Sequence, residues 1–326
     1  MSRRRGPPRL GEFELIDRLI KPLARGFPGA LGLSDDAALV RLPEGSELVV
    51  AADAMVAGVH FLPDDPPGLI AGKLLRVNLS DLAAMGADGL GYLVTFARPA
   101  ALDDAWLAAF WHGLAVDQAR FGVHLLGGDT VSTTGPLALS LTVLGTAPQG
   151  AALLRSGARP GDEIWVSGTL GEAALGLRIL RGLAVTEEQA LPLVDRYRTP
   201  RPRLALGRAL RGLAHAAIDV SDGLLADLGH ILETSQVGAQ LEVERLPISA
   251  VARSVPDALN AALTGGDDYE LLFTAPPEAA ARVAALATAE VPLTRIGVVT
   301  AAPGVVVLDR DGRPLSTAPR GGWQHF

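Results

Sequence analysis

The chain has 326 residues, a formal net charge of -7, 48% hydrophobic residues and no cysteine. This length predicts about two domains, and the acidic balance argues against nucleic acid as a partner, because nucleic acid requires clustered basic side chains. The lack of cysteine excludes disulfides, thiolate metal sites and cysteine nucleophiles, and it is compatible with the cytoplasm, where we expect the protein. No stretch approaches the roughly 18 consecutive apolar residues of a membrane span, so no membrane association is expected.

The first half of the chain predicts a mixture of strands and helices. In chain order the predicted elements are a strand over 46–52, a helix over 68–85, a helix from Asp103 to about 120, and strands over 123–126 and 137–145. The first strand ends at Asp53, and the strand over 123–126 runs into Gly127-Gly128-Asp129. Gly86 and Gly122 suit the ends of the two helices, and Asp103 suits the N-cap of the second.

Two turn clusters, at 148–150 and 159–162, interrupt the pattern and place a domain boundary near 148. We therefore expect domains at 1–148 and 149–326. The second half predicts strands over 163–167, 216–219, 239–243 and 269–274, helices near 171–182, 202–213, 223–234 and 256–263, and a hairpin turn at Asp311-Gly312. Strands and helices do not alternate strictly, which favours α+β packing, with helices on one face of a sheet, over a doubly wound fold.

Six acidic clusters stand at the ends of apolar or glycine-rich segments. They are Ser34-Asp35-Asp36, Asp53, Asp81, Gly127-Gly128-Asp129, Asp219-Val220-Ser221-Asp222 and Gly265-Gly266-Asp267-Asp268. Each cluster alone is ambiguous, because a turn, a helix N-cap or a polar helix face is an alternative explanation for most of them. Aspartate is a poor strand former and is costly to bury unpaired, so their joint occurrence indicates a shared partner. The commonest such partner is a hard cation such as Mg2+, which takes oxygen ligands and usually holds substrate phosphates. The clusters therefore suggest a Mg2+-dependent enzyme that handles phosphate.

Several other residues are candidates for phosphate or substrate contacts. The Gly127-Gly128 pair either forms a tight turn or lets the backbone approach a phosphate. Ser221 and Asp222 lie where a strand meets a helix, so each either caps the helix or faces a phosphate at its N-terminus. Arg155 either clamps a phosphate or forms a surface ion pair. His60 either packs against the fold or contacts a substrate.

The common phosphate-binding scaffolds are missing from the sequence. Lys21 and Lys73 are the only lysines, and Gly72-Lys73 is followed by Leu74-Leu75, so no G-x-x-x-x-G-K-[ST] loop exists. The H-R-D and D-F-G motifs of protein kinases are also missing. Gly168-Thr169-Leu170-Gly171 lacks the full G-x-G-x-x-G pattern. Any phosphate chemistry therefore uses a different scaffold.

In order along nearly the whole chain, these residues resemble the thiamine-monophosphate kinase family. The matching motifs are Gly11-Glu12-Phe13, Ser34-Asp35-Asp36, Asp53 with Val56-Ala57-Gly58-Val59-His60-Phe61, Val77-Asn78-Leu79-Ser80-Asp81-Leu82-Ala83-Ala84-Met85-Gly86-Ala87, Gly127-Gly128-Asp129-Thr130, Arg155-Ser156-Gly157, Ile218-Asp219-Val220-Ser221-Asp222-Gly223-Leu224, Gly265-Gly266-Asp267-Asp268-Tyr269-Glu270 and Gly322-Trp323-Gln324-His325-Phe326. The run from Asn78 to Ala87 is the most specific of them.

The resemblance implies a two-domain fold like that of aminoimidazole ribonucleotide synthetase. An N-terminal α/β domain, with helices on one face of its sheet, would bind metal and ATP and form a homodimer by strand pairing. A C-terminal α+β domain would complete the ATP and substrate site. The implied reaction converts ATP and thiamine monophosphate into ADP and thiamine diphosphate with several Mg2+ ions.

The resemblance also implies roles for individual residues. The implied metal ligands are Asp36, Asp53, Asp81, Asp129, Asp219 and Asp222. The residues implied to hold ATP are Gly128, Asp129, Arg155 and Ser221, and those implied to face thiamine monophosphate are His60, Asp267 and Trp323. Trp323 suits the flat cationic thiazolium ring by cation–π attraction, and an aspartate suits its charge.

Two departures from the family pattern lie near the implied metal ligands. Ala51, Ala52 and Ala54 surround Asp53 where the family usually has hydroxyl residues before the aspartate, so only backbone carbonyls remain as further oxygen ligands. Ser34 stands in place of a usual glycine. Neither change removes a carboxylate, but the alanines leave the number of metal ions open.

The nucleophile in this reaction would be a phosphate oxygen of thiamine monophosphate, which is already ionised at neutral pH. No covalent or general-base catalytic residue is then expected, because the work is to align two polyanions and neutralise their charge. One alternative is another ATP-dependent enzyme of the same fold, although the selenophosphate synthetases and hydrogenase-maturation relatives use a cysteine or selenocysteine. The other alternative is a non-catalytic, metal-dependent nucleotide-binding protein.

Overall fold

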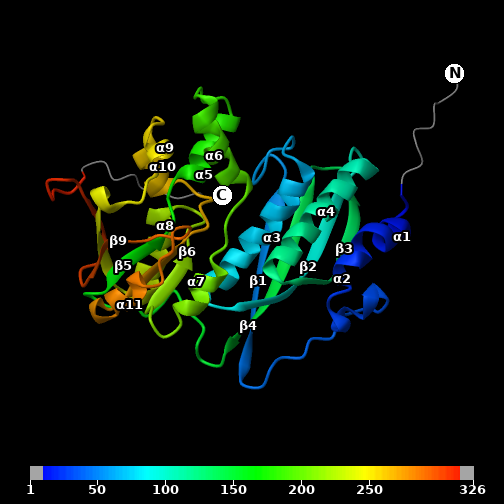
Figure 1. Ribbon diagram of the computed structural model, residues 1–326, viewed down its shortest axis with the longest axis horizontal. Helices are drawn as coiled ribbons and strands as arrows, with labels where there is room; N and C mark the ends of the chain where they lie inside the picture. Colours follow the sequence, from blue (N-terminus) through cyan, green and yellow to red (C-terminus); the bar gives the residue numbers. More distant parts are fainter. Residues whose placement is uncertain (1–9, 316–326) are drawn as a thin grey trace. The chain divides into compact units, whose positions relative to one another are not determined.

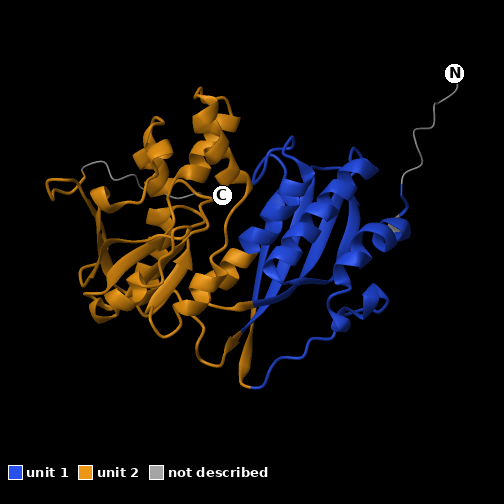
Figure 2. Cartoon of the chain, in the orientation of Figure 1, with its two compact units in different colours: residues 1–44, 50–78, 89–146 blue, residues 45–49, 79–88, 147–326 orange. Residues whose placement is uncertain are grey.

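The computed structural model describes residues 10–315, and residues 1–9 and 316–326 lie outside the described part (Figure 1). The chain divides into two compact units (Figure 2). Unit 1 comprises Met1–Glu44, Val50–Asn78 and Gly89–Thr146, and unit 2 comprises Gly45–Val49, Leu79–Asp88 and Ala147–Phe326. Two roles remain predictions: metal binding, ATP binding and dimerisation for residues 1–148, and completion of the ATP and substrate site for residues 149–326. No helix in the described part of the chain is both long and apolar enough to cross a bilayer.

The first sheet has four strands in the order β1-β4-β2-β3. Their bounds are β1 Ser46–Val56, β2 Asp88–Pro99, β3 His124–Thr133 and β4 Ala138–Pro148. Two long helices, α3 (Pro67–Ala84) and α4 (Asp104–Phe121), lie along one face of this sheet (Figure 1). The expectation of a sheet with helices on one face is therefore confirmed.

Side-chain alternation in β2 explains the one-sided packing. Tyr92, Val94 and Phe96 are buried, whereas Leu93 and Thr95, which point to the opposite face, are exposed. The Phe96 ring meets Phe110 of α4 edge to face, with 5.2 Å between ring centroids. Aromatic contacts of this kind add to the apolar area that the helix buries on the sheet.

The ends of α4 follow the capping rules used for the prediction. The Asp103 side chain accepts a hydrogen bond of 2.8 Å from the backbone N–H of Trp106. Gly122, with φ 67°, occupies the left-handed position after the last turn, and its N–H donates to the carbonyl of Gln118. The helices expected over 68–85 and from Asp103 are thus confirmed to within about one residue.

Short helical segments precede the first strand and were not predicted. They are α1 Glu12–Leu15, the π-helical η1 Ile16–Ile20, α2 Lys21–Ala24 and the 3-10 helical η2 Pro28–Leu33. Leu31 and Leu33 have positive φ angles of 51° and 55°, conformations that non-glycine residues adopt rarely. The local helix propensity of the sequence therefore does not predict this segment.

The second sheet has six strands in the order β10-β7-β9-β5-β8-β6. The strands are β5 Glu163–Ser167, β6 Ala216–Asp219, β7 Gly238–Glu242, β8 Leu271–Ala275, β9 Leu293–Thr300 and β10 Gly304–Leu308. The pair β10–β7 is parallel, and the pairs that join β7, β9, β5, β8 and β6 are antiparallel. This mixed sheet with its helices confirms the α+β class expected for the second half.

Successive residues of this sheet enter two separate hydrophobic clusters. Ile218 of β6 and Leu272 of β8 belong to one cluster, and Ala217 and Phe273 belong to the other. The helical elements of unit 2 are α5 Glu172–Leu180, α6 Glu187–Arg198, α7 Leu204–Ala209, α8 Leu224–Ser235, η3 Val243–Arg245, α9 Ala250–Arg253, α10 Ala258–Thr264, η4 Pro277–Ala279 and α11 Ala280–Ala284. The central strands β6 and β8 are buried along their whole length, as expected for strands covered on both faces, whereas the edge strand β10 is partly exposed.

The sequence prediction missed the longer elements β2, α6, β9 and β10, and also the short helical segments η3, α9, η4 and α11. The sequence of β2 contains Gly89 and Gly91, and glycine is depleted in strands. Helix α6 carries Pro192 in its interior, which argued against a helix. Its capping box between Thr186 and Gln189 was the available signal, because each side chain bonds the backbone N–H of the other.

Candidate functional site

Unit 1 contains a cavity of about 580 Å³ whose lining combines apolar side chains with carboxylates. Ile20, Leu93 and Leu126 are among the apolar lining residues. Asp36 and Asp129, two of the predicted metal ligands, also line it. The cavity therefore brings together an apolar surface and two carboxylates that the sequence separates by more than ninety positions.

Gly128 lines the same cavity, but it lies inside a strand, not in a turn after it. The strand predicted over 123–126 continues as β3 through the glycines and Asp129, with Gly128 opposite Val94 of β2. A Cβ atom at Gly128 would overlap the Val94 carbonyl oxygen, so glycine is required for these strands to pair. The register shifts between Tyr92 and Leu93, and this bulge accommodates the glycines.

Asp53 also lies inside its strand, because β1 continues to Val56. The backbone N–H of Asp53 donates a hydrogen bond of 3.0 Å to the Asn78 side chain on α3. His60 lies in the turn after β1, where its Nδ1 accepts from the backbone N–H of Val56 at 3.0 Å. This bond fixes the ring with Nδ1 as the acceptor, so neutral His60 carries its proton on Nε2.

In unit 2, Asp219 ends β6 and is 4% exposed. Its Oδ2 accepts a hydrogen bond of 2.6 Å from the Ser80 hydroxyl, which comes from the most specific of the sequence motifs. Asp81, the next residue on α3, is half-buried. The structure therefore brings Ser80 to Asp219 across 139 positions of sequence, a contact that no local pattern encodes.

The loop after β6 is held by Asp227, which the sequence prediction did not single out. One oxygen of Asp227, Oδ2, accepts hydrogen bonds of 3.0 Å from the backbone N–H groups of Ser221, Asp222 and Gly223. Burial, followed by the negative charges of Asp219 and Asp222, raises the pKa of Asp227 to about 7. These amides are thus engaged within the protein, so Ser221 would meet a phosphate through its hydroxyl.

The segment 267–270 pairs with this loop. The N–H of Asp267 donates to the carbonyl of Ser221 at 2.8 Å, and the N–H of Tyr269 donates to the carbonyl of Val220 at 2.8 Å. The Tyr269 hydroxyl donates to Oδ1 of Asp267 at 3.2 Å. Asp267, a predicted substrate contact, therefore lies beside the loop that carries Asp219 and Asp222.

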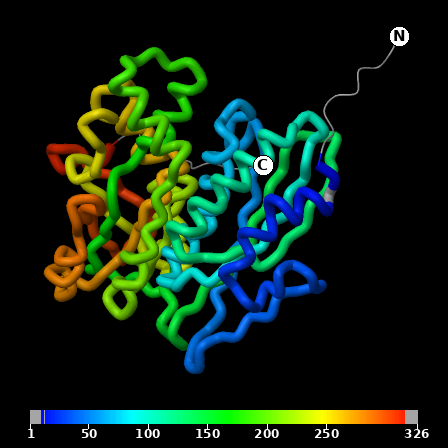
Figure 3. Tube along the Cα trace, turned by 45° about the vertical axis from the view of Figure 1, so that its right-hand side comes forward, coloured from blue at the N-terminus to red at the C-terminus, as the bar shows by residue number. Residues whose placement is uncertain are grey.

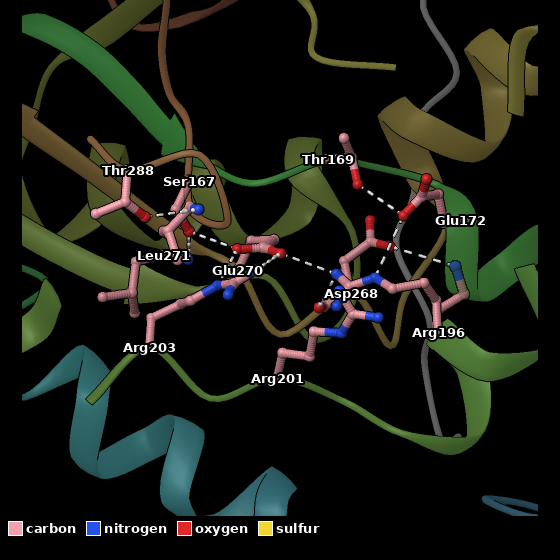
Figure 4. A network of polar contacts seen from close by, with 12 residues as sticks. Ser167, Thr169, Glu172, Arg196, Arg201, Arg203, Asp268, Glu270, Leu271 and Thr288 are labelled. Carbon is pink, nitrogen blue, oxygen red and sulfur yellow. Dashed lines mark hydrogen bonds and ion pairs between the residues drawn. The ribbon is translucent and has the colours of Figure 1, made fainter. Parts of the chain in front are cut away.

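A buried network of charged side chains lies under this segment (Figure 4). Asp268 accepts from the N–H of Gly171, at the start of α5, at 2.7 Å. Burial is the main cause that raises the pKa of Asp268 to about 8. The N–H group that opens α5 is therefore bonded to Asp268, and the glycine-rich segment before the helix does not offer it to a phosphate.

The remaining predicted residues lie apart from these contacts or beyond the described residues. Arg155 is exposed, and its loop is attached to α8, because its carbonyl oxygen accepts from the hydroxyl of Thr234 at 3.2 Å. Trp323 lies outside the described residues. Among residues 10–315, no three acidic or histidine side chains gather closely enough to hold a metal ion alone.

Paired carboxylates still fit Mg2+, because this ion is usually bound by one or two carboxylates together with waters and substrate phosphates. Asp36 and Asp129 line one cavity, and Asp219 and Asp222 flank one loop. Asp219, Asp222 and Asp227 repel one another, and a bound cation would offset this repulsion. These oxygen donors would therefore suit a cation that arrives together with a phosphate.

The chain matches the AIR synthase related proteins, whose N-terminal domain matches residues 34–147 and whose C-terminal domain matches residues 159–310. It is 46% identical to thiamine-monophosphate kinase of Caulobacter vibrioides over 322 residues, which cover 96% of this chain and 90% of the relative. The solved thiamine-monophosphate kinase of Stenotrophomonas maltophilia K279a has a TM-score of 0.83 and 44% identity and covers 94% of this chain and 98% of its own. The structure of AaThiL complexed with AMPPCP and TMP has a TM-score of 0.78 and 30% identity over 97% of each chain.

Proposed function

Because this chain belongs to the thiamine-monophosphate kinase family of AIR synthase related proteins, we propose that it transfers the γ-phosphoryl group of ATP to thiamine monophosphate. The products are thiamine diphosphate and ADP. The observation that carries this function is 46% identity over 96% of the chain to an enzyme of that name. AaThiL, a relative in this family, was solved in complex with AMPPCP and TMP.

The cavity of unit 1 suits the nucleotide. Its apolar lining would fit a purine base, and the carboxylates of Asp36 and Asp129 would hold a cation that neutralises phosphate charge. We assign Gly128 to the backbone approach that the phosphates require, since no side chain fits at this position. Arg155 and Ser221 are the other residues that we assign to ATP, through the guanidinium and the hydroxyl.

We propose that Mg2+ is the cation and that several ions take part. Their ligands would be the carboxylates of Asp36, Asp53, Asp81, Asp129, Asp219 and Asp222. When bound, Mg2+ neutralises phosphate charge and polarises the transferring group. The chain contributes the carboxylates and their orientation: the Ser80 hydroxyl holds one oxygen of Asp219, and Asp227 fixes the backbone around Asp222.

The acceptor needs no base from the protein, because its phosphate oxygen is already ionised at neutral pH. No catalytic residue is therefore proposed for proton transfer. We assign His60, Asp267 and Trp323 to thiamine monophosphate. Asp267 would offset the charge of the thiazolium ring, and its hydrogen bond from Tyr269 orients the carboxylate.

A direct assay tests the function. Purified protein with ATP, Mg2+ and thiamine monophosphate should form thiamine diphosphate and ADP in equal amounts. Asp53→Asn and Asp219→Asn should each lose most of this activity while their circular dichroism stays that of the wild type. Tight ATP binding without thiamine diphosphate would instead indicate a non-catalytic nucleotide-binding protein, and turnover with a different acceptor would indicate another enzyme of this fold.

We also propose that the protein is cytoplasmic, since its phosphoryl donor ATP is a cytoplasmic metabolite. We further propose that it is a homodimer. The face of the first sheet opposite α3 and α4 exposes large apolar side chains, with Val50 55% and Val131 44% exposed. Exposed apolar patches on a sheet usually mark an interaction surface, and a second copy of the chain is the occupant we propose. Val50→Asp should shift the mass measured by light scattering from dimer to monomer, and an unchanged mass would contradict the proposed surface.

A further inference from the structure

Glu270, directly before β8, is fully buried, and its carboxylate accepts hydrogen bonds from three other side chains (Figure 4). Arg203 donates to it twice, with Nε at 2.6 Å from Oε2 and Nη2 on Oε1. Arg196 donates to Oε1 at 2.8 Å, and the Ser167 hydroxyl donates to Oε2 at 2.6 Å. These partners come from the end of β5, from α6 and from the stretch before α7, so Glu270 is fixed from three directions.

The surroundings of Glu270 leave little room for an alternative arrangement. A Cβ atom at Gly168 would overlap the Glu270 carboxylate. Nε of Arg196 lies 3.3 Å from an oxygen of Glu172, so this arginine is shared between two carboxylates. Buried ion pairs are often replaced by apolar residues without loss of stability. Stability alone therefore does not explain why five buried or nearly buried polar groups meet here.

The backbone of Glu270 connects the network to the loop that carries Asp219 and Asp222. The Glu270 carbonyl accepts from the N–H of Val220 at 2.8 Å, in the ladder that also joins 267–269 to 220–221. A displacement of Glu270 would therefore move the loop.

Two residues of this segment have strained backbones. Asp267 has φ 70° and Tyr269 has φ 51°, which are left-handed conformations that side chains other than glycine adopt rarely. Their side chains contact each other, whereas Asp268 and Glu270 are buried in the network. Such a backbone persists only when its surroundings hold it, and the buried residues supply that hold.

From these contacts, and on the basis of the function proposed above, we propose that Glu270, Arg196 and Arg203 are positioning residues. They set the Asp267 carboxylate and the Ser221–Asp222 loop in the geometry that receives thiamine monophosphate and its cation. None of the three needs to touch the substrate. Their effect is transmitted through the backbone of 267–270.

The test compares Arg203→Met, which keeps side-chain volume but removes two donors to Glu270, with Arg203→Lys, which restores the charge. The matched control is Arg76→Met, which breaks a buried ion pair with Asp117 in unit 1, where Arg76 Nη2 donates to Oδ1 at 2.7 Å. Two quantities are measured on folded protein: the KM for thiamine monophosphate, and backbone hydrogen exchange of peptides that cover 219–223 and 267–270 by mass spectrometry.

We expect Arg203→Met to raise the KM and the exchange rate in both peptides by about tenfold, with Arg203→Lys between it and the wild type. Arg76→Met should lower the unfolding midpoint and change neither quantity by more than about twofold. Wild-type KM and exchange in Arg203→Met, or equal changes in Arg76→Met, would overturn the proposal. If Arg203→Met does not fold, Ser167→Ala removes one donor and should change both quantities in the same direction, and unchanged values would overturn the proposal.

The exchange measurement separates this proposal from the proposed function. A wild-type protein that forms no thiamine diphosphate refutes the function. In that case, faster exchange in Arg203→Met alone would still show that the network holds the loop, and unchanged exchange would refute the network as well.

Discussion

Replacing Asp227 by alanine removes the one oxygen that accepts hydrogen bonds from three consecutive backbone N–H groups, those of Ser221, Asp222 and Gly223. Ser221 and Asp222 are half-buried, so water can replace their bonds in part, whereas Gly223 is buried and its N–H would be left without an acceptor. An unsatisfied buried group costs about 1–3 kcal/mol, and each solvated one costs less. We expect Asp227→Ala to lower the free energy of unfolding by about 2–4 kcal/mol.

Asp227→Asn separates the hydrogen bonds from the charge. The amide oxygen still accepts, and the substitution removes a carboxylate that burial and the charges of Asp219 and Asp222 disfavour. Its free energy of unfolding should therefore fall by no more than about 1.5 kcal/mol. The loop in Asp227→Ala should also lose its order, so phosphoryl transfer should fall more in Asp227→Ala than in Asp227→Asn.

Urea unfolding at neutral pH, followed by circular dichroism, measures both variants against the wild type. A shift of the midpoint at constant slope indicates a change in stability rather than a change in the unfolded state. If Asp227→Ala lies within about 0.5 kcal/mol of the wild type, the three bonds contribute nothing net and the reasoning is refuted. If Asp227→Asn is as destabilised as Asp227→Ala, the charge and not the bonding geometry holds the loop.

Three further predictions concern Gly128, Asp268 and the proposed metal. Gly128→Ala should cost about 1–3 kcal/mol of stability and weaken ATP binding, because its Cβ would overlap the Val94 carbonyl oxygen. Gly127→Ala should be tolerated, because only a flexible leucine side chain lies near the added methyl group. Calorimetry measures the stability and the ATP affinity of both variants, and equal effects would contradict the reasoning. Burial raises the pKa of Asp268 to about 8, against about 3.9 when unfolded, so its stabilising contribution is present below about pH 4 and is lost as the pH rises to about 8. The unfolding free energy of the wild type relative to Asp268→Asn should therefore fall by up to about 1.4 kcal/mol per pH unit between pH 5 and pH 7, and a flat difference in urea unfolding would argue against a buried proton. EDTA should abolish the formation of thiamine diphosphate and excess Mg2+ should restore it; activity that persists in EDTA would contradict the proposed metal.

The sequence predicted the elements whose signals are local. Helix α4 was found from its N-cap at Asp103 and its glycine at 122, and both function as caps in the structure. The strands through Asp53 and Asp129 were predicted too short, because aspartate and glycine are depleted in strands. Here the pairing of β2 with β3 overrides that preference, and the absence of a side chain at Gly128 is what permits the pairing.

The acidic motifs were visible in the sequence, but the groups that hold them were not. Asp227 resembles any polar residue on a helix, and only the folded loop shows that three amides converge on it. Glu270 lies 103 positions from Ser167 and 67 from Arg203, so no spacing rule connects them. Such contacts depend on the order of strands in the sheet, which single-sequence patterns do not specify.

The way the backbone amides are used explains why we propose that this chain binds phosphate through aspartates and a cation. In scaffolds that bind phosphate directly, free N–H groups at the start of a helix face the anion, often with a lysine. Here the amides that lead into α8 are bonded to Asp227, and the amide that opens α5 is bonded to Asp268. The chain has only two lysines among its 326 residues. We therefore propose that phosphate charge at these loops is neutralised by a divalent cation, which aspartates attract. Because Asp227 and Asp268 occupy the amides, the proposed phosphate site would depend on the carboxylates of Asp219 and Asp222 and on the cation that they would hold.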